Sequence, residues 1–395
     1  MSVVLPPLLP DAPWRHRPGL DALVAALGPG TARWVGGAVR DTLLGKDVSD
    51  LDLATLHAPE EVIRRCDAAG IKTIPTGIAH GTVTTVTKGT VVEVTTLRRD
   101  VSTDGRHAVV EATHDWREDA ARRDFTMNAL YADPASGEVF DWFGGLDDLA
   151  ARRVRFIGDP YQRIAEDHLR ILRFFRFHAR FGDAIDGDGL EACVARANDL
   201  MALSRERIAA ELMKLLVAIA AVPVVALMEA RGLFRPVLPE VTAEGVARLE
   251  ALAEREAAAG VAPDAVRRLA ALVPPDAAED VGARLKLSNA DRKRLAAATA
   301  GAGEEGVHAL AYRVGPAIAL DRLLLAGADP SPIIDWTPPA LPLGGGALVT
   351  RGLARGPDVA RALKAVETRW IAEGFPDAER VDRIADEEVA RSEGR

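Results

Sequence analysis

Residues 32–55 read ARWVGGAVRDTLLGKDVSDLDLAT, and this stretch decides the fold of the N-terminal part of the chain. The apolar run Ala32–Val35 predicts a short strand, and a glycine turn then leads into a helix over about residues 38–44. Residues 51–55 predict the next strand. Because Gly36 and Gly37 leave backbone N–H groups exposed where a helix begins, this turn is suited to hold a phosphate group.

Two aspartates, Asp50 and Asp52, stand at the start of that second strand. Side chains two residues apart on a strand point to one face, about 7 Å apart, so these carboxylates can bridge a pair of divalent cations. Glu93 is the predicted third carboxylate, because an acid is costly to bury unpaired in a strand. The alternative is that Asp50 caps a turn while Asp52 and Glu93 face water. Metal-binding acids beside a phosphate seat favour nucleotidyl transfer.

The composition indicates a globular, largely helical protein of two or three domains. The 395 residues are 48% hydrophobic and 27% charged, with a net charge of −9, which argues against nonspecific coating of nucleic acid but leaves RNA binding open. The two cysteines, Cys66 and Cys193, predict neither a disulfide scaffold nor a zinc site, and a cytoplasmic protein fits. The N-terminus is a poor signal peptide. The most apolar run, residues 215–228, is too short to span a bilayer and predicts a buried helix broken at Pro223.

The pattern along the chain predicts a mixed α/β region followed by helices. Pro59 opens a helix to about residue 69, and residues 83–87 and 91–97 predict a hairpin that turns at Lys88 and Gly89. Residues 125–131 look helical, and residues 141–148 look like a loop. Beyond Tyr161 we expect one strong helix over residues 164–181. The next helix is capped by Ser204, with the apolar stripe Ile208, Leu212, Leu215 and Ile219. The glycines at 344–346 read as a linker.

Two arginine-rich segments supply candidate ligands for phosphate. Arg122 and Arg123 precede Asp124, and an arginine fork suits a triphosphate while an aspartate can accept a hydrogen bond from a ribose hydroxyl. In the second segment, residues 152–180 hold eight arginines against three acids, a local charge of +5. Asp167 and Arg170 stand one turn apart on the expected helix and are neighbours on its surface. Solvated, salt-bridged helices are the alternative reading of both segments.

Taken together, these motifs resemble those of the class II tRNA nucleotidyltransferases, the CCA-adding enzymes, and of their relatives the bacterial poly(A) polymerases. The resemblance covers about the first 210 residues and is loose in the last third. It rests on ordered blocks: residues 35–41, 44–45, 50–55, 93–95, 122–129, 141–145, 158–177 and 204–211. One departure is His168, which stands where family members often have proline.

The resemblance implies an α+β fold with a polymerase-beta-like mixed sheet in the head, followed by an all-helical neck, body and tail. We expect the catalytic head at residues 1–150, a neck that recognises the nucleotide base at 151–220, and a tRNA-binding body and tail at 221–395. The implied roles are as follows: Asp50, Asp52 and Glu93 hold magnesium; Gly36, Gly37, Arg40 and Arg123 hold phosphate; Asp124 contacts ribose; Asp167 and Arg170 read the base; Arg173 and Arg176 support them.

The expected function is therefore the template-independent addition of C, C and A to the 3′ end of tRNA from CTP and ATP, with Mg²⁺ and release of pyrophosphate. A poly(A) polymerase, a CC-adding or A-adding specialist, and a non-catalytic RNA-binding protein are the alternatives. The sequence gives no oligomeric state and leaves open how tRNA is held, although Arg284, Lys286, Arg292, Lys293 and Arg294 are candidates for that contact.

Overall fold

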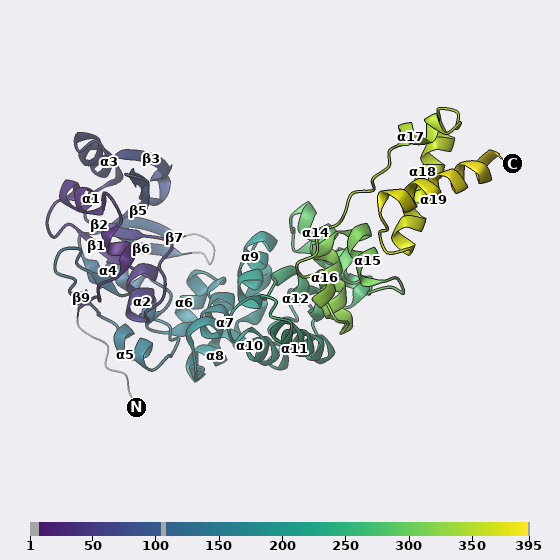
Figure 1. Ribbon diagram of the computed structural model, residues 1–395. Coiled ribbons are helices and arrows are strands. Elements are labelled where there is room, and N and C mark those ends of the chain that lie inside the picture. Colours follow the sequence, from purple (N-terminus) through teal and green to yellow (C-terminus); the bar gives the residue numbers. More distant parts are fainter. Residues whose placement is uncertain (1–7, 104–107, 394–395) are drawn as a thin grey trace. The chain divides into compact units, whose positions relative to one another are not determined.

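The computed structural model describes residues 8–103 and 108–393 of the chain, which separates into two compact units, Met1–Pro239 and Glu240–Arg395. The first unit begins with a mixed sheet and continues into helices, and the second is helical throughout its described residues (Figure 1). The expected α+β order is confirmed. The finer division at residues 150 and 220 stays a prediction. Among the described residues, no helix is both long and apolar enough to cross a membrane.

The sheet of the first unit has seven strands in the order β3-β4-β5-β2-β1-β8-β9. These strands are β1 (Ala32–Val35), β2 (Asp52–Thr55), β3 (Lys72–Gly77), β4 (Thr82–Thr87), β5 (Thr90–Thr96), β8 (Tyr131–Ala132) and β9 (Val139–Phe140). β2 and β5 run parallel, and the other neighbours in the sheet are antiparallel. A separate hairpin pairs β6 (Arg98–Thr103) with β7 (Ala108–Ala112). The predicted hairpin is confirmed, because β4 and β5 meet at Lys88 and Gly89, both with positive φ.

The helices of the first unit fall into two groups. Those around the sheet are α1 (Leu20–Leu27), α2 (Gly37–Leu43), α3 (Pro59–Ala68), α4 (Trp116–Ala121) and α5 (Gly145–Ala150). Those that follow are α6 (Pro160–Glu166), α7 (Arg170–Phe181), α8 (Gly187–Ala195), α9 (Arg205–Leu216) and α10 (Ala221–Ala230). Short 3-10 turns cover Pro13–His16, Ile78–His80, Thr126–Asn128 and Ala197–Ala202.

An aromatic cluster fixes α7 to the sheet domain. Phe125 packs against Phe156, Phe174 and Phe177, with ring centroids 5.0, 6.3 and 5.2 Å away. Phe156 also stacks on Phe174 at 5.4 Å. Because these rings are buried and interlocked, they hold the arginines of α7 at a fixed position beside the loop that carries Asp124.

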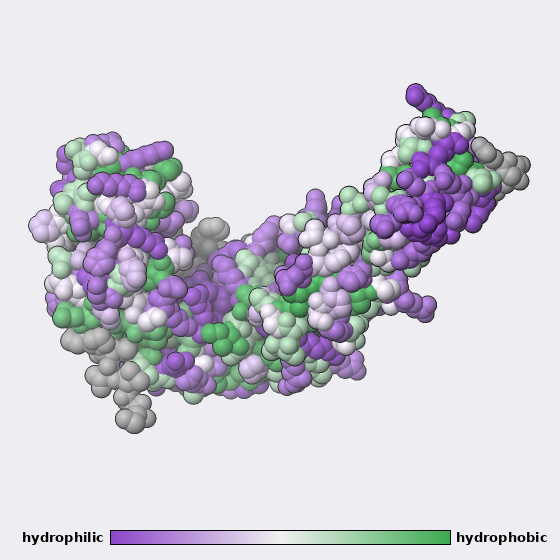
Figure 2. All heavy atoms as spheres, viewed as in Figure 1, coloured by the Kyte–Doolittle hydropathy of each residue, from purple (hydrophilic) through white to green (hydrophobic). Residues whose placement is uncertain are grey.

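The second unit is built from helix pairs. Its helices are α11 (Ala243–Ala258), α12 (Ala265–Leu272), α13 (Ala278–Arg284), α14 (Asn289–Ala298), α15 (Val307–Val314), α16 (Pro316–Ala326), α17 (Gly345–Thr350), α18 (Pro357–Ala372) and α19 (Ala378–Glu393), with 3-10 turns at Pro275–Ala277 and Ser331–Ile333. The last two helices pack over a core that includes Trp370 and Val381, while their outer faces are strongly hydrophilic (Figure 2).

The predicted helix over residues 164–181 is wrong, because the chain breaks between α6 and α7. Asp167 has an extended backbone (φ −150°, ψ 106°), and its carboxylate accepts a hydrogen bond from the backbone N–H of Leu169 at 3.1 Å. A short acidic side chain that bonds its own neighbouring backbone competes with the helical hydrogen bond. Asp167 and Arg170 therefore lie at a junction of two helices rather than on one helix face.

Five smaller expectations also fail. Residues 125–131 form one 3-10 turn and strand β8, and the expected loop over 141–148 contains the start of α5, whose N–H groups at Gly145 and Leu146 are capped by Asp141. The apolar run 215–228 breaks before Pro223, which sits in the first turn of α10 as proline tolerates. Ile219 lies outside α9 and is 86% exposed. Of the three glycines read as a linker, Gly345 and Gly346 open α17.

Candidate active site

Two of the three predicted metal ligands, Asp52 and Glu93, lie side by side on one face of the sheet. Asp52 in β2 stands in register with Glu93 in the parallel strand β5, and the backbone N–H of Glu93 donates to the carbonyl of Leu51 at 2.9 Å. Neighbouring strands are about 4.8 Å apart, so the two carboxylates leave the same face side by side. Glu93 is exposed and Asp52 is half-buried.

The electrostatics of Asp52 show that these acids act on one another. Burial raises the pKa of Asp52, and the negative charges of Glu93 and Asp50 raise it further, while Arg123 opposes them. Asp50 is exposed and lies before the first residue of β2, so the alternation of side chains along the strand does not fix the direction of its side chain. In the part of the chain that the structure describes, no group of three Asp, Glu, His or Cys side chains is arranged closely enough to coordinate a metal ion.

The glycine turn lies beside these acids. Gly36 has φ +64°, a conformation that favours glycine, and it caps the start of α2. A Cβ atom at this position would stand 3.3 Å from Nη1 of Arg123. Arg123 therefore lies close to both the backbone of Gly36 and the carboxylate of Asp52. The glycine turn and the guanidinium, which both favour anions, stand beside the acidic pair.

Arg123 is held in place by a buried acid and a buried phenol. Its Nε donates to the Tyr131 hydroxyl at 3.0 Å, and its Nη2 lies 3.4 Å from Asp119, which also accepts from Tyr131 at 2.5 Å. Burial alone would lower the pKa of Arg123, but Tyr131 and Asp119 raise it overall. The guanidinium is thus charged and fixed, as a phosphate contact requires.

Arg40 is committed to other protein groups. Its Nη1 donates to Asn128 Oδ1 at 2.5 Å, its Nε donates to Asp41 at 2.8 Å, and its guanidinium lies 4.3 Å from the centre of the Phe181 ring. Asn128 in turn donates to Asp124 at 2.9 Å. Arg40 therefore connects α2 to the loop of Asp124, and a direct phosphate contact would require it to release one of these partners.

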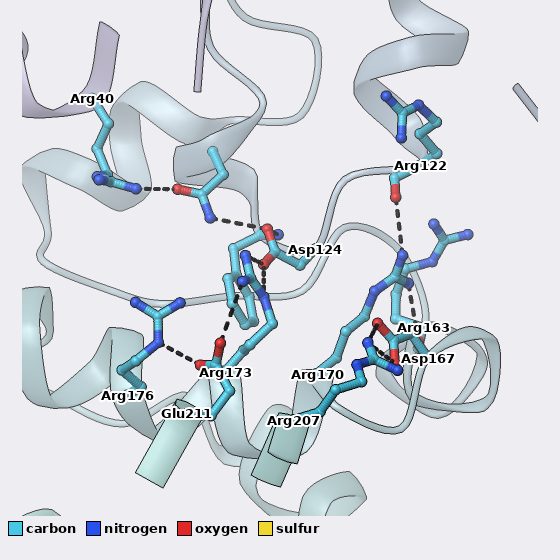
Figure 3. A network of polar contacts seen from close by, with 12 residues as sticks. Arg40, Arg122, Asp124, Arg163, Asp167, Arg170, Arg173, Arg176, Arg207 and Glu211 are labelled. Atoms are coloured by element: carbon cyan, nitrogen blue, oxygen red, sulfur yellow. Dashed lines mark hydrogen bonds and ion pairs between the residues drawn. The ribbon is translucent and has the colours of Figure 1, made fainter. Parts of the chain in front are cut away.

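Asp124 is the centre of a second network, drawn in Figure 3. Arg173 donates from both Nε and Nη2 to Asp124 Oδ2, at 2.8 and 2.6 Å. Arg176 donates to Glu211 of α9 at 2.5 Å, and Glu211 also lies 3.8 Å from Arg173. Burial would raise the pKa of Asp124, but the Arg173 guanidinium and the Asn128 amide lower it overall. The network presents a charged carboxylate backed by two arginines.

The two residues expected to read the base are also occupied by protein partners. Asp167 accepts from Arg207 of α9 on both oxygens, at 3.0 and 2.9 Å. Arg170 donates to Glu166 at 2.6 Å and to the backbone carbonyls of Arg163 and Arg122 at 2.9 and 3.0 Å (Figure 3). Arg170 is held on several sides, whereas Asp167 is held by one side chain that can be displaced.

The structure brings the predicted residues into two groups. One group holds Gly36, Arg123 and the acids Asp50, Asp52 and Glu93, and the other holds Asp124, Asp167, Arg170, Arg173 and Arg176. Sequence reasoning did not find the contacts of Asn128 and Arg207, which join partners 88 and 40 residues away in the chain. The only signal was that both stand inside blocks on which the family resemblance rests, residues 122–129 and 204–211.

Comparisons with known proteins match two stretches of the chain, and the first of them contains Gly36, Asp50, Asp52, Glu93, Arg123 and Asp124. Residues 32–155 match the family model described as the Poly A polymerase head domain, and residues 184–244 match the model described as the probable RNA and SrmB-binding site of polymerase A. The human protein named CCA tRNA nucleotidyltransferase 1, mitochondrial, is 47% identical over 189 residues, which are 47% of this chain and 43% of the relative. A CCA-adding enzyme of Anoxybacillus flavithermus is 39% identical over 211 residues, 53% of this chain and 52% of the relative. The chain thus spans about half the length of the curated relatives it matches.

Solved structures extend the likeness along the chain. The crystal structure of the Bacillus stearothermophilus CCA-adding enzyme in complex with CTP aligns with a TM-score of 0.72 and 29% identity, over 92% of this chain and 95% of that one. The Thermotoga maritima CCA-adding enzyme complexed with tRNA aligns with a TM-score of 0.66, over 92% and 91% of the two chains; at 19% identity, this match shows the fold alone.

Proposed function

The chain belongs to the family that carries the poly A polymerase head domain, and on that premise we propose that it is a nucleotidyltransferase that adds C, C and A to the 3′ end of tRNA. CTP and ATP are the proposed substrates, and pyrophosphate is the product. The observation that carries the proposal is the in-register pair of Asp52 and Glu93, which faces Arg123 and the turn at Gly36. The names of the relatives and structural neighbours support the same substrates.

The acids are a donor set suited to a hard divalent cation. They offer only carboxylate oxygens, which magnesium prefers. Burial, followed by repulsion from Glu93 and Asp50, raises the pKa of Asp52, and a bound cation would offset this cost of keeping the carboxylate charged. We propose that Asp50, Asp52 and Glu93 would hold Mg²⁺. Two such ions, when bound, lower the pKa of the attacking hydroxyl and neutralise the leaving pyrophosphate.

The residues of the chain itself bind and orient the nucleotide. The backbone N–H of Gly37, at the start of α2, and the fixed guanidinium of Arg123 hold the triphosphate, so that the α-phosphate stands beside the acids. The N–H of Gly36 donates to the carbonyl of Leu130 at 3.2 Å, so it would bind phosphate only by exchanging that partner. Asp124, held by Arg173, accepts a hydrogen bond from the ribose, which favours ribonucleotides. Asp167 and Arg170 present acceptors and donors to the base edge once Asp167 exchanges Arg207 for the nucleotide.

A poly(A) polymerase remains the second candidate, because its head domain gives the matching family its name. We favour the tRNA enzyme, since the curated relatives and the solved structures named above are CCA tRNA nucleotidyltransferases or CCA-adding enzymes. A cytoplasmic location is part of the proposal rather than a finding, and the human relative is named as mitochondrial.

The test uses a tRNA transcript that lacks its last three nucleotides. With Mg²⁺ and with CTP and ATP supplied singly and together, growth by three nucleotides followed by a stop is the expected result. Long A tails would establish the poly(A) polymerase, and a protein that binds this RNA but extends no RNA would reject both enzymes.

A matched pair of variants tests the assignment of the acids. Asp52→Asn should reduce extension at least a thousandfold, because one side of the cation site is lost. Asp47→Asn removes an exposed acid from the same loop and should leave extension unchanged. Full activity in Asp52→Asn would end the metal assignment.

A further inference from the structure

A basic cavity lies in the first unit, beside the network around Asp124. Its volume is about 510 Å³, and it is lined by Lys46, Arg176, Arg180, Lys214 and the segment 217–219. Lys46 stands in the loop that leads to Asp50, while Arg176 and Arg180 are one turn apart on α7 and Lys214 is near the end of α9. Only Arg176 among these belongs to the networks around Asp124.

Positive charge in this cavity exceeds the negative charge beside it. Arg176 pairs with Glu211, which is shared with Arg173, and Arg180 lies 3.7 Å from Asp41, which is shared with Arg40. Within the described ranges, neither Lys46 nor Lys214 has a carboxylate within ion-pair distance. Four cations thus face two carboxylates that already serve other arginines, so the cavity is suited to an anion.

The mouth of the cavity has an apolar side. Ile219 is 86% exposed and Val217 is 43% exposed, in the short connection between α9 and α10. A free phosphate ion gains nothing from such a surface, whereas a nucleic-acid strand presents phosphates together with sugars and bases that can cover it. A volume of about 510 Å³ also exceeds what one phosphate group fills.

We propose that this cavity holds the phosphate backbone of the RNA whose 3′ end is extended, at nucleotides that precede the reacting hydroxyl. The proposal rests on the function proposed above and adds a named contact surface for its RNA partner. Arg176 connects the cavity to the network around Asp124 through Glu211, and Lys46 precedes Asp50 by four residues in the same loop. Residues 214–219 fall in the segment that matches a probable RNA-binding model. The competing source of phosphate is the triphosphate of the incoming nucleotide.

The test measures binding and catalysis separately. Arg180→Ala/Lys214→Ala removes two exposed cations that the catalytic proposal does not use. In EDTA and without nucleotide, this variant should bind the shortened tRNA about tenfold more weakly at about 150 mM salt. The slope of log K against log salt should become shallower by about 0.7 to 0.9 for each cation removed. In steady-state extension, KM for tRNA should rise while KM for CTP and kcat stay unchanged.

Arg64→Ala/Lys72→Ala is the matched control, since it removes the same two residue types from exposed positions on α3 and β3 that do not line the cavity. Ile219→Ser should weaken tRNA binding without changing the salt slope, because it removes apolar contact alone. A rise in KM for CTP, with unchanged tRNA binding, would assign the cavity to the triphosphate and overturn the proposal. Equal effects of both double variants would do the same.

The outcomes also separate this proposal from the function. If the wild-type protein binds tRNA in a way that depends on Arg180 and Lys214 yet extends no RNA, the contact surface stands and the enzymatic function falls. If extension proceeds normally and the double variant binds tRNA like the wild type, the function stands and the cavity is excluded.

Discussion

Single ion pairs near the candidate site stabilise its buried charges, and the pair of Asp124 and Arg173 is the clearest case. Asp124 is buried, and Arg173 supplies two of its hydrogen bonds. Arg173→Met leaves this carboxylate without its counter-charge, so we expect a loss of about 2 to 3 kcal/mol in the free energy of unfolding, since Arg173 is only partly buried. Urea denaturation measures this loss, and Asp124→Asn/Arg173→Met should recover part of it.

The same pair predicts a pH dependence. The pKa of Asp124 is lowered in the folded protein, so the pair contributes stability that is present above the ordinary carboxyl value of about 4. That contribution disappears as the pH falls through the lowered pKa. Below pH 4, the stability difference between the wild type and the double variant should therefore shrink. A difference that stays constant from pH 7 to pH 2 would contradict the assigned shift.

His178 of α7 predicts a pH dependence in a higher range. Its ring is buried, its Nδ1 has no hydrogen-bond partner among the described residues, and burial lowers its pKa although Asp183 opposes the shift. As the pH falls through about 6.5, His178 is protonated in the unfolded chain but stays neutral in the folded protein. The free energy of unfolding should therefore fall as the pH drops below 6.5. His178→Phe should remove this dependence, and urea denaturation at pH 5, 6, 7 and 8 compares the two proteins.

At the scale of elements, the junction between α6 and α7 connects the fold to nucleotide choice. Asp167 ends α6, holds the N–H of Leu169 and is paired with Arg207. Asp167→Ala should relax the choice between CTP and ATP about tenfold or more while extension continues, because the acids on the sheet are untouched. Competition assays with both nucleotides measure the ratio, and Asp199→Ala is a control acid on a neighbouring 3-10 turn. An unchanged ratio would exclude Asp167 from base recognition.

Elements set by local patterns could be predicted from the sequence, while those set by distant partners could not. Val and Thr alternation gave β4 and β5, Pro59 gave the start of α3, and Ser204 gave the start of α9. The break at Asp167 depends on a side chain that bonds its own backbone and on Arg207, 40 residues away. Residues 125–131 look helical in isolation, but pairing of Tyr131 with Val35 and Phe140 makes that end a strand.

The candidate site shows the same limit. Gly36, Asp52 and Glu93 could be named because glycine turns and acids in strands stand out in a sequence. The hydrogen bonds of Arg40 to Asn128 and Asp41 could not be named in this way, and neither could those of Arg170 to backbone carbonyls, because they depend on three-dimensional packing. Packing also engages two of the residues that the sequence offered as tRNA contacts. Arg294 is paired with Asp321 and Asp264, and Arg284 is paired with Glu240.

At the scale of the whole molecule, the two units have separate stabilising cores. The second unit contains a buried network of balanced charge, made by Glu256, Asp264, Asp321, Arg267, Arg268 and Arg294. Asp321 is fully buried and accepts from Arg294 at 2.7 and 3.0 Å and from Arg267 at 3.4 Å. Removing one partner of a buried pair leaves an uncompensated charge, which costs about 3 to 5 kcal/mol.

Asp321→Ala should therefore destabilise the second unit while leaving the first folded. Hydrogen exchange followed by mass spectrometry should show lost protection in α11, α12, α14 and α16, and unchanged protection in the sheet of the first unit. Asp335→Ala removes an exposed acid from the same unit and should change neither pattern. Equal loss of protection in both units would show that they unfold together.

The parallel pairing of β2 with β5 has a consequence for which changes in chain length the protein can tolerate. Asp52 and Glu93 share a face only because their strands are aligned residue for residue, although α3, β3 and β4 intervene between them. A residue inserted or deleted in the surface loops of that intervening segment leaves the alignment untouched. The same change inside either strand turns one carboxylate to the opposite side of the sheet, so a well-folded but inactive protein would result.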